Sequence, residues 1–401
     1  MFLSYTLFEF ASASHLDLQS PSSVTIRPMS AQSSDNAAPL LRGEVVYMYA
    51  FDVAYEMIRK PVQTLLGQAV AQFAVDVSKR SPRQLFFYRP QMVRLPPVEK
   101  FGPLGPVRLE RSVKLLPVGA ISITVRVPFE VRQVEDLVAL HDLRFTDGSY
   151  LYDEVRDLAE QVRKELKSYY IRPVEKLGDE EAYTVFCLQA PTAGAGHPGA
   201  EDWLREHRRS VSALLTEEAD PGRLSDQESD ESSSRALSYY ESDVVVIDWD
   251  AALIIDEPKY FDEVLFIMEL ANVQLAELEA YDRILDDAVE RSYRDVGRRR
   301  WRGLAAQHQL REIRIDMARL SDELSNTTKF FGDWHLARIY QNLSARFHLA
   351  DWHRAIDEKL KTLDDMYQLL QHDQNNRWMF LLEIMVVFLF VLEIVKSFWG
   401  K

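Results

Sequence analysis

The C-terminal end of the chain is one apolar run, long enough to cross a lipid bilayer. From Trp378 to Trp399, two glutamates, one lysine and one serine are the sole interruptions. As a helix this run would reach roughly 33 Å, enough for the hydrocarbon core of a bilayer. Tryptophans at both ends, beside Arg377 and Lys396, are typical of membrane interfaces. We predict a transmembrane anchor over residues 377–399; the alternative is an apolar oligomerisation helix in a soluble protein. The anchoring residues are Trp378, Phe380, Leu389 and Trp399.

An anchor in this position leaves the rest of the sequence on one side of the membrane. We therefore expect a single-pass protein with the bulk of the chain in the cytoplasm. The basic residues that flank the run, Arg377 on one side and Lys396 and Lys401 on the other, do not by themselves decide the orientation.

Composition and charge exclude several classes of protein. With 401 residues, 47% of them apolar, the chain has room for a substantial core. A net charge of −15 argues against DNA binding, because phosphate neutralisation requires a basic surface. Cys187 is the sole cysteine, which rules out an internal disulfide and a zinc–thiolate cluster. The common catalytic and nucleotide-binding motifs are missing from the sequence, so we predict no cofactor and no enzymatic activity.

Strands and helices alternate over residues 41–256, after a tail over residues 1–40 that we predict to be disordered. Strand-like stretches occur at 43–53, 83–97, 120–129 and 181–189; helical stretches occur at 61–78, 130–142, 149–171 and 199–215. The order is roughly β-α-β-β-α-β with additions, which is compatible with a ferredoxin-like α+β domain. In the strand at 120–129, branched apolar residues alternate with Ser122, Thr124 and Arg126, which predicts one buried face and one wet face.

Two further stretches complete this α+β domain. Residues 217–238 are acidic, rich in serine and poor in large apolar residues, so we predict a mobile surface loop. After it, SDVVVIDWDAALIID reads as a strand pair that turns about Asp248, Trp249 and Asp250.

Residues 257–376 have the pattern of long helices. Apolar residues recur on one helical face between Val264 and Val289, and again between Ile356 and Leu370. From Leu310 to Leu324 they step by three and four residues, as in a coiled coil. We therefore predict a helical domain that joins the anchor and supports association into homo-oligomers.

The stretch LARIYQNLSARFHLADWHRAIDEKL (336–360) and the strand DVVVIDWDAALII are the basis of a family resemblance. Together with the anchor they resemble the "required for meiotic nuclear division" family, a domain of unknown function (number 155). The resemblance would cover residues 42–400 and implies a membrane-attached protein without established enzymatic chemistry. The absence of an Arg-rich presequence favours a bacterial relative of that family, and hence a bacterial inner membrane.

Four aspartates lie on the predicted hairpin, at positions 243, 248, 250 and 256. Carboxylates of this kind bind hard cations, although solvated acids at a turn require no metal. We keep Asp248 and Asp250 as the site of an alternative function, a metal-dependent enzyme or a ligand sensor, and predict no metal site otherwise.

A basic cluster over residues 291–302 is the strongest local departure from the acidic composition. The partner-binding residues that we predict in it are Arg294, Arg298, Arg299, Arg300, Trp301 and Arg302. Such a cluster can bind an acidic protein or RNA, or can pair with acids between helices. If the helices on either side of Gly332 form an antiparallel hairpin, the cluster lies roughly 27 Å from Trp378, too far to touch headgroups.

The function that these features predict is a non-enzymatic, membrane-tethered scaffold or adaptor that presents an α+β domain on a helical stalk. Its partners would be the lipid bilayer, further copies of the chain, and an acidic protein or RNA.

Overall fold

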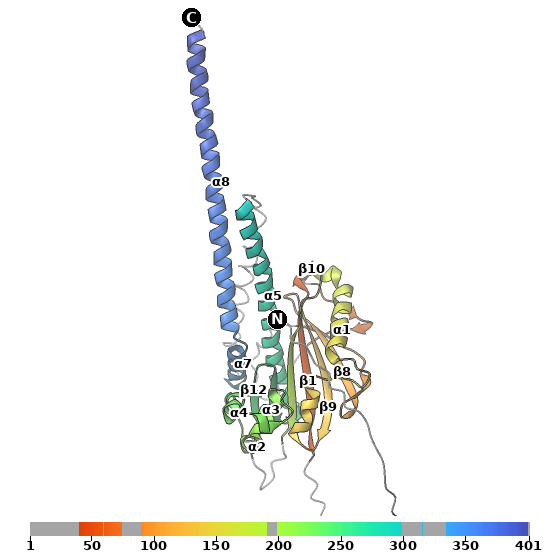
Figure 1. Ribbon diagram of the computed structural model, residues 1–401. Helices are drawn as coiled ribbons and strands as arrows, with labels where there is room; N and C mark the ends of the chain where they lie inside the picture. The colour runs from red at the N-terminus through yellow and green to blue at the C-terminus, as the bar shows by residue number, and fades with distance from the viewer. Residues whose placement is uncertain are drawn as a thin grey trace, which may run out of the picture. The chain divides into compact units, whose positions relative to one another are not determined.

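The computed structural model describes residues 40–58, 60–73, 90–190, 199–298, 315 and 334–399. The class is α+β, as predicted: a large sheet, helices in the C-terminal part, and one apolar C-terminal helix (Figure 1). The strands are β1 (Leu41–Asp52), β2 (Ala54–Met57), β3 (Thr64–Leu65), β4 (Gln68–Ala69), β5 (Ala71–Gln72), β6 (Gln91–Arg94), β7 (Val98–Gly102), β8 (Gly105–Leu115), β9 (Ala120–Val131), β10 (Tyr170–Pro173), β11 (Glu181–Gln189), β12 (Val244–Ile247) and β13 (Ala251–Asp256). The helices are η1 (Val134–Leu140), α1 (Leu151–Glu165), η2 (Lys167–Tyr169), α2 (Ala200–Glu206), α3 (Arg208–Leu215), η3 (Pro221–Arg223), α4 (Asp226–Ser233), α5 (Pro258–Arg298), α7 (Trp334–Arg346) and α8 (Leu349–Trp399).

Within these residues the main sheet has the order β12-β13-β11-β1-β9-β8-β6-β5. Strand β1 is central and antiparallel to both β9 and β11, whereas β11 and β13 are parallel. Because β1 is covered on both faces, its apolar residues are continuous rather than alternating. Val45 and Tyr47 enter one core, with α1 and η1, while Val46 and Met48 enter the other, with α5, α7 and α8.

The polar face of β9 is buried at Ser122 and Thr124 and half-buried at Arg126, so the prediction that it faces water is wrong at these positions. Ser122 and Thr124 are 1% and 6% exposed because α5 covers them. Glu269 on α5 accepts hydrogen bonds from Ser122 Oγ at 2.6 Å, from Thr124 Oγ1 at 3.4 Å, and from the Lys114 ammonium group on β8. The alternation of residues along β9 therefore identified its two faces correctly. The polar face of β9, however, packs against polar residues of α5 and not against solvent.

The predicted strands at 120–129 and 181–189 and the hairpin are confirmed as β9, β11 and β12–β13. The predicted helix after Pro61 is wrong over residues 61–73, which carry the short strands β3, β4 and β5; residues 74–78 lie outside the described part. Residues 130–142 end β9 and continue as the 3₁₀ helix η1. The helix at 199–215 is divided at His207 into α2 and α3.

The acidic segment 217–238, predicted as a mobile loop, contains helix α4. Ser225 caps this helix by accepting a hydrogen bond from the Glu228 amide at 3.0 Å. Ser229 and Ser232 are fully buried, and the Ser212 hydroxyl on α3 donates to the Ser229 carbonyl at 3.1 Å. Small serines let α4 approach α3 closely, so a segment that lacks large apolar residues still packs.

The predicted long helix after Pro258 is confirmed as α5, and the residues between Val264 and Leu285 pack on the sheet and on α8. In α8, Ile356, Leu360 and Leu363 are buried, and the same helix continues without a break through the apolar run. The segment Trp378–Lys396 is long and apolar enough to cross a membrane, and none of it is buried. The coiled-coil pattern at 310–324, apart from Ile315, and the tail up to residue 39 lie outside the described residues.

Candidate ligand-binding pocket

A cavity of about 180 Å³ lies where the ends of several strands meet the middle of α5. Its walls come from the end of β1, from β2, from the β8–β9 turn, from β10 and its following residue, and from one face of α5. The lining residues are Asp52, Ala54, Tyr55, Val118, Arg172, Val174, Glu277, Ala280, Tyr281 and Ile284. Most of this surface is apolar, and three charged side chains interrupt it, which is the usual construction of a small-molecule site.

The backbone around the cavity is held by a close approach at Gly119. Its carbonyl accepts hydrogen bonds from the amides of Val53 and Ala54, at 3.1 and 3.0 Å. A Cβ atom at position 119 would lie 1.9 Å from the Ala54 carbonyl oxygen, and the φ angle of +96° also favours glycine. The β8–β9 turn is therefore fixed against the β1–β2 connection, and Asp52 and Val118 are positioned with it.

On the opposite side, β10 brings Arg172 to the cavity. Its neighbour Pro173 pairs with Ala54 on β2, and the Val174 amide donates to the Val53 carbonyl at 3.0 Å. Arg172 has a φ angle of +51°, an uncommon conformation for a residue with a side chain. Its guanidinium lies 5.3 Å from the centre of the Tyr55 ring. Backbone conformations of this kind are concentrated at binding and catalytic sites.

Asp52 is the acid with the most altered chemistry in the cavity. Burial raises the pKa of its carboxyl to about 7, against the opposing effects of the Arg283 charge and a hydrogen bond from the Ala54 backbone. A carboxyl with this pKa changes its charge in the physiological range, so it can accept a proton or bind a cation near neutral pH.

A pair of acids, Glu181 and Glu279, lies beside Arg283. Burial, followed by a hydrogen bond and charge repulsion from Glu279, raises the pKa of Glu181 to about 8. Arg283 opposes that shift and forms a 3.8 Å ion pair with Glu279. Glu277 on the same helix lines the cavity and is 7% exposed. Acids thus predominate around this end of the sheet, and the arrangement suits a ligand with an apolar body and a cationic group.

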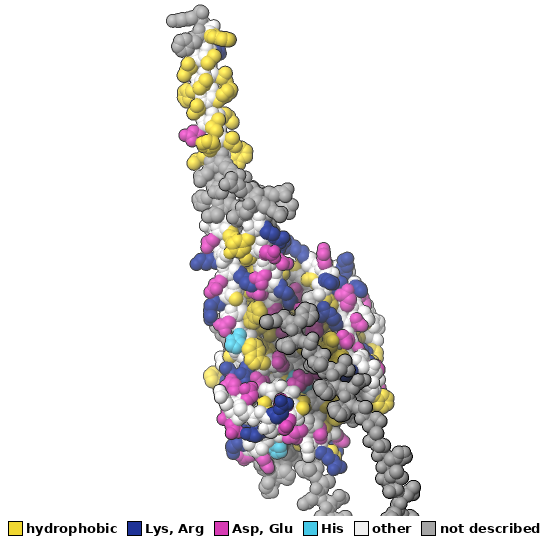
Figure 2. All heavy atoms as spheres, in the orientation of Figure 1, with side chains coloured by type: hydrophobic (Ala, Val, Ile, Leu, Met, Phe, Trp, Pro, Cys, Tyr) yellow, Lys and Arg dark blue, Asp and Glu magenta, His cyan; other side chains and the backbone are white. Residues whose placement is uncertain are grey.

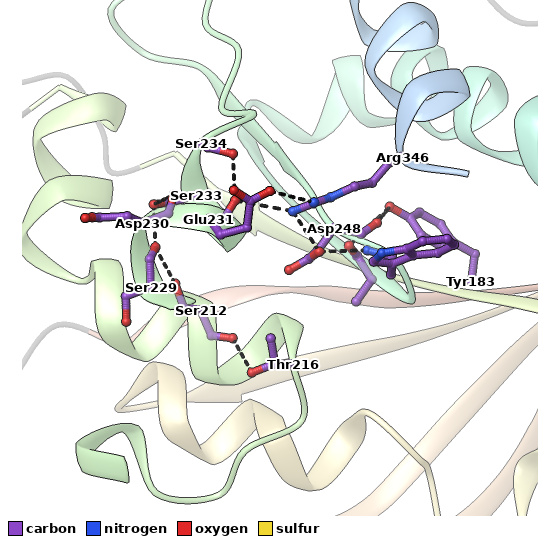
Figure 3. Close-up of polar contacts among 12 residues, drawn as sticks. Tyr183, Ser212, Thr216, Ser229, Asp230, Glu231, Ser233, Ser234, Asp248 and Arg346 are labelled. Carbon is purple, nitrogen blue, oxygen red and sulfur yellow. Dashed lines mark hydrogen bonds and ion pairs between the residues drawn. The ribbon is translucent and has the colours of Figure 1, made fainter. Parts of the chain in front are cut away.

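At the predicted site, Asp248 forms a buried ion pair with Arg346. Arg346 at the end of α7 reaches the hairpin, and its guanidinium lies 3.0 Å from the Asp248 carboxylate and 3.1 Å from Glu231 on α4 (Figure 3). The Tyr183 hydroxyl donates to the backbone carbonyl of Asp248 at 3.0 Å. Arg346 and Asp248 are 8% and 6% exposed. Asp248 is therefore committed to a buried ion pair that joins three elements.

The four hairpin aspartates do not converge on one point. Asp243 accepts from the amides of Tyr239 and Tyr240, and Asp256 accepts from the Glu257 amide, at the open end of the hairpin. Asp250 is exposed at the turn, at the opposite end. An antiparallel pair with this register separates the two ends, so a single ion cannot bind all four.

Among the described residues, His141, Asp142 and Glu217 are the group that could hold a metal ion. Their ligand atoms lie within 4.8 Å of one another, and two of the three residues are exposed. Burial lowers the pKa of His141, which favours the neutral ring that a metal requires. Sequence reasoning missed this group because Glu217 lies far from the other two in the chain.

The predicted partner-binding residues are described only in part. Arg294 is exposed on α5, which is described as far as Arg298. Arg299, Arg300, Trp301 and Arg302 lie outside the described residues. The anchoring residues Trp378, Phe380, Leu389 and Trp399 are all exposed on α8.

Fold and pocket together define an α+β protein with an acidic, largely apolar cavity, joined to a candidate membrane-spanning helix. The chain belongs to the family described as "Uncharacterized protein MJ0711, N-terminal domain", whose model matches residues 42–262. It is similar to the uncharacterized protein MJ0711 of Methanocaldococcus jannaschii, with 23% identity over 221 residues. That match covers 54% of this chain and 66% of the relative, slightly less than two thirds. No solved structure matches the chain.

These findings correct the family assignment. The resemblance to the "required for meiotic nuclear division" family, and with it a bacterial member of that family, is wrong, because the matching family is a different one. The misleading signal came from helices and a valine-rich strand, whose composition is shared by many unrelated proteins. The matched region contains Asp52 and Arg172 but ends near the start of α5, before Glu277.

Proposed function

We propose that the protein is a membrane-tethered binding protein, a non-enzymatic adaptor or sensor that holds a small-molecule pocket on a rigid helical stalk. The observation that carries this proposal is the double role of α5. One of its faces, with Glu277 and Tyr281, forms a wall of the cavity. Another bears Asp282, which pairs with Lys359 on α8 at 2.6 Å, and α8 continues into the apolar segment. Pocket and anchor therefore share one supporting helix.

The chemistry of the cavity supports a small organic amine as the ligand. Asp52 and Glu277 face it from the sheet and from α5, and a cation between them would offset the desolvation of both. A volume of about 180 Å³ is similar to that of an engineered cavity of about 150 Å³ that binds benzene. An amine with one ring or a short alkyl chain therefore matches the space available.

Binding of 2-phenylethylamine to the detergent-solubilised full chain tests the pocket. Because Asp52 ionises near pH 7 and the amine stays charged, affinity should rise about tenfold between pH 6 and pH 8. Asp52→Asn, which keeps an acceptor for the Ala54 amide, should lower the affinity and flatten this pH dependence. Isothermal titration calorimetry measures both.

Two controls make that titration specific. The neutral analogue 2-phenylethanol should bind more weakly and show no rise with pH. Asp157→Asn, at an exposed position on α1, should bind the amine as the natural chain does. Equal binding of amine and alcohol, or an Asp52→Asn variant with unchanged affinity at pH 8, would rule out the amine site.

Removal of residues 375–401 tests the tether. The full chain should sediment with membranes and stay there after a carbonate wash, whereas the shortened chain should appear in the supernatant. Single-pass insertion with the body in the cytoplasm predicts that protease added to intact cells leaves the body uncut. Recovery of the full chain in the carbonate supernatant would show that attachment is peripheral. Self-association through the helices of residues 257–376 stays a prediction, whereas the bacterial inner membrane rested on the family resemblance that the comparisons overturn.

An enzyme is the second candidate, and the pKa of Asp52 favours it. A carboxyl that titrates near pH 7 inside a cavity can act as a general acid or base. If the protein is an enzyme, Asp52→Asn should abolish its catalytic activity, while the variant should still bind the neutral analogue 2-phenylethanol.

A further inference from the structure

Two helix ends and a hairpin turn meet around the buried ring of His141. His141 and Asp142 follow directly after η1, and Glu217 lies just beyond the end of α3. The ligand atoms of these three residues lie within 4.8 Å of one another. Helix α3 packs against both η1 and β13, so the core beneath the two helix ends holds them together.

The hairpin turn adds a third acid, Asp250. Its carbonyl accepts a hydrogen bond from the Thr184 amide on β11 at 3.0 Å. The ring of Phe186, two residues further along β11, lies 5.8 Å from the ring of His141. Asp250 and His141 are therefore placed beside the same strand. Burial lowers the pKa of His141, and the charges of all three acids oppose that shift, so each of them acts on the ring.

His141 is a buried side chain without a hydrogen-bond partner. The residue is 7% exposed, and its Nε2 atom is buried and unpaired among the described residues. Its Nδ1 atom faces the Glu217 carboxylate at 4.0 Å, which is beyond hydrogen-bond distance. Buried polar atoms are nearly always paired, so this ring requires an explanation. A metal ion at Nδ1 would give it a partner on the side that faces the acids.

The acids of this group lack basic partners as well. Within the described part of the chain, no lysine or arginine forms an ion pair with Asp142, Glu217 or Asp250. On the face that Figure 2 shows, by contrast, acidic and basic side chains intermix over the described body. Glu217 also has a φ angle of +56° at the end of α3, where glycine is preferred and the helix dipole disfavours an acid. A bound cation would offset the repulsion among the three negative charges.

We propose that this junction binds a divalent transition-metal ion of the Zn²⁺ type, held by His141, Asp142, Glu217 and Asp250. Imidazole suits Zn²⁺ and related ions, whereas Mg²⁺ and Ca²⁺ prefer sets of oxygen ligands. Ligand atoms around Zn²⁺ lie roughly 3.5 Å apart, so the exposed carboxylates of Asp142 and Glu217 would move inward by about 1 Å. The site shares no residue with the pocket. Its ion would fasten η1 and α3 to the hairpin turn.

Isothermal titration of the full chain in detergent with Zn²⁺, after removal of metals with EDTA, tests this site. One Zn²⁺ per chain should bind, and Mg²⁺ and Ca²⁺ should bind at least about tenfold more weakly. Asp142→Asn and Glu217→Gln change exposed carboxylates to amides, so both variants should fold. Each should lower the affinity for Zn²⁺ about tenfold or more. Zn²⁺ should also raise the unfolding temperature of the natural chain but not that of the double variant.

The matched control is the exposed pair of His348 and Asp351 beside the start of α8, whose side chains lie 3.0 Å apart. This pair offers the same two kinds of ligand at the surface. His348→Gln combined with Asp351→Asn should therefore leave the titration with Zn²⁺ unchanged. Absence of Zn²⁺ binding by the natural chain would overturn the proposal. Binding that persists in the double variant of Asp142 and Glu217, or that is lost in the control, would place the ion elsewhere and overturn it too.

Discussion

Replacing Arg346 by methionine is expected to lower the free energy of unfolding by about 3–5 kcal/mol. The change leaves the buried Asp248 carboxylate without its cationic partner and removes the contact of α7 with Glu231 on α4. Thermal or urea unfolding of the full chain in detergent, followed by circular dichroism, measures the loss.

Adding Asp248→Asn to Arg346→Met should recover part of the stability, because no unpaired buried charge then remains. The exposed Arg354, which pairs with Asp351 on the surface of α8, provides the control: Arg354→Met should change stability little. A loss for Arg346→Met no larger than that of the control would show that the buried pair contributes nothing to folding.

Replacing Glu269 by leucine is expected to destabilise the protein by a similar amount, about 3–5 kcal/mol. Glu269 is 5% exposed and lies between α5 and the sheet, where Lys114 and the hydroxyls of Ser122 and Thr124 all donate to it. Leucine leaves a buried ammonium group and two buried hydroxyls without this acceptor. Unfolding of the full chain in detergent again measures the effect.

Two further variants separate charge from hydrogen bonding at this site. Glu269→Gln keeps an acceptor oxygen and should cost less than Glu269→Leu. The double change Lys114→Met with Glu269→Leu removes both charges and should be more stable than Glu269→Leu alone. If the double variant is the less stable one, the packing of the two aliphatic stems, and not the buried charge, determines the loss.

Both of these buried pairs connect the sheet to C-terminal helices, through residues that are distant in the chain. The sequence could predict local elements, but it could not predict contacts of this kind. The strands β9 and β11, the hairpin and the apolar face of α5 follow from local periodicity and were predicted correctly. Periodicity could not show that α5 is partly polar where it meets β9, since Lys114, Ser122 and Glu269 are distant in the chain. The serine-rich helix α4 was missed because small residues pack through close approach and not through apolar area.

The pocket could not be predicted for a related reason. Asp52 is the last residue of the apolar strand β1, Arg172 lies in the short strand β10, and Glu277 lies in the middle of the long helix α5. Each is an ordinary residue in its local context, and the sheet order is what brings them together. The aspartates of the hairpin looked more promising in the sequence because they are close in the chain, yet Asp248 proved to be a structural partner of Arg346. Proximity along the chain was thus a poor guide to this candidate pocket.

The unbroken course of α8 has a mechanical consequence. Helices in bilayers tilt by about 20° on average, and the tilt responds to bilayer thickness. Leu360, buried against the body, lies roughly 27 Å along the helix from Trp378. If α8 crosses a bilayer as one stiff rod, a change of about 20° in tilt displaces Leu360 sideways by roughly 9 Å, far more than a packed core can absorb. The body must then swing as a unit, so the thickness of the host membrane would determine which face of the sheet domain is turned toward the lipid surface.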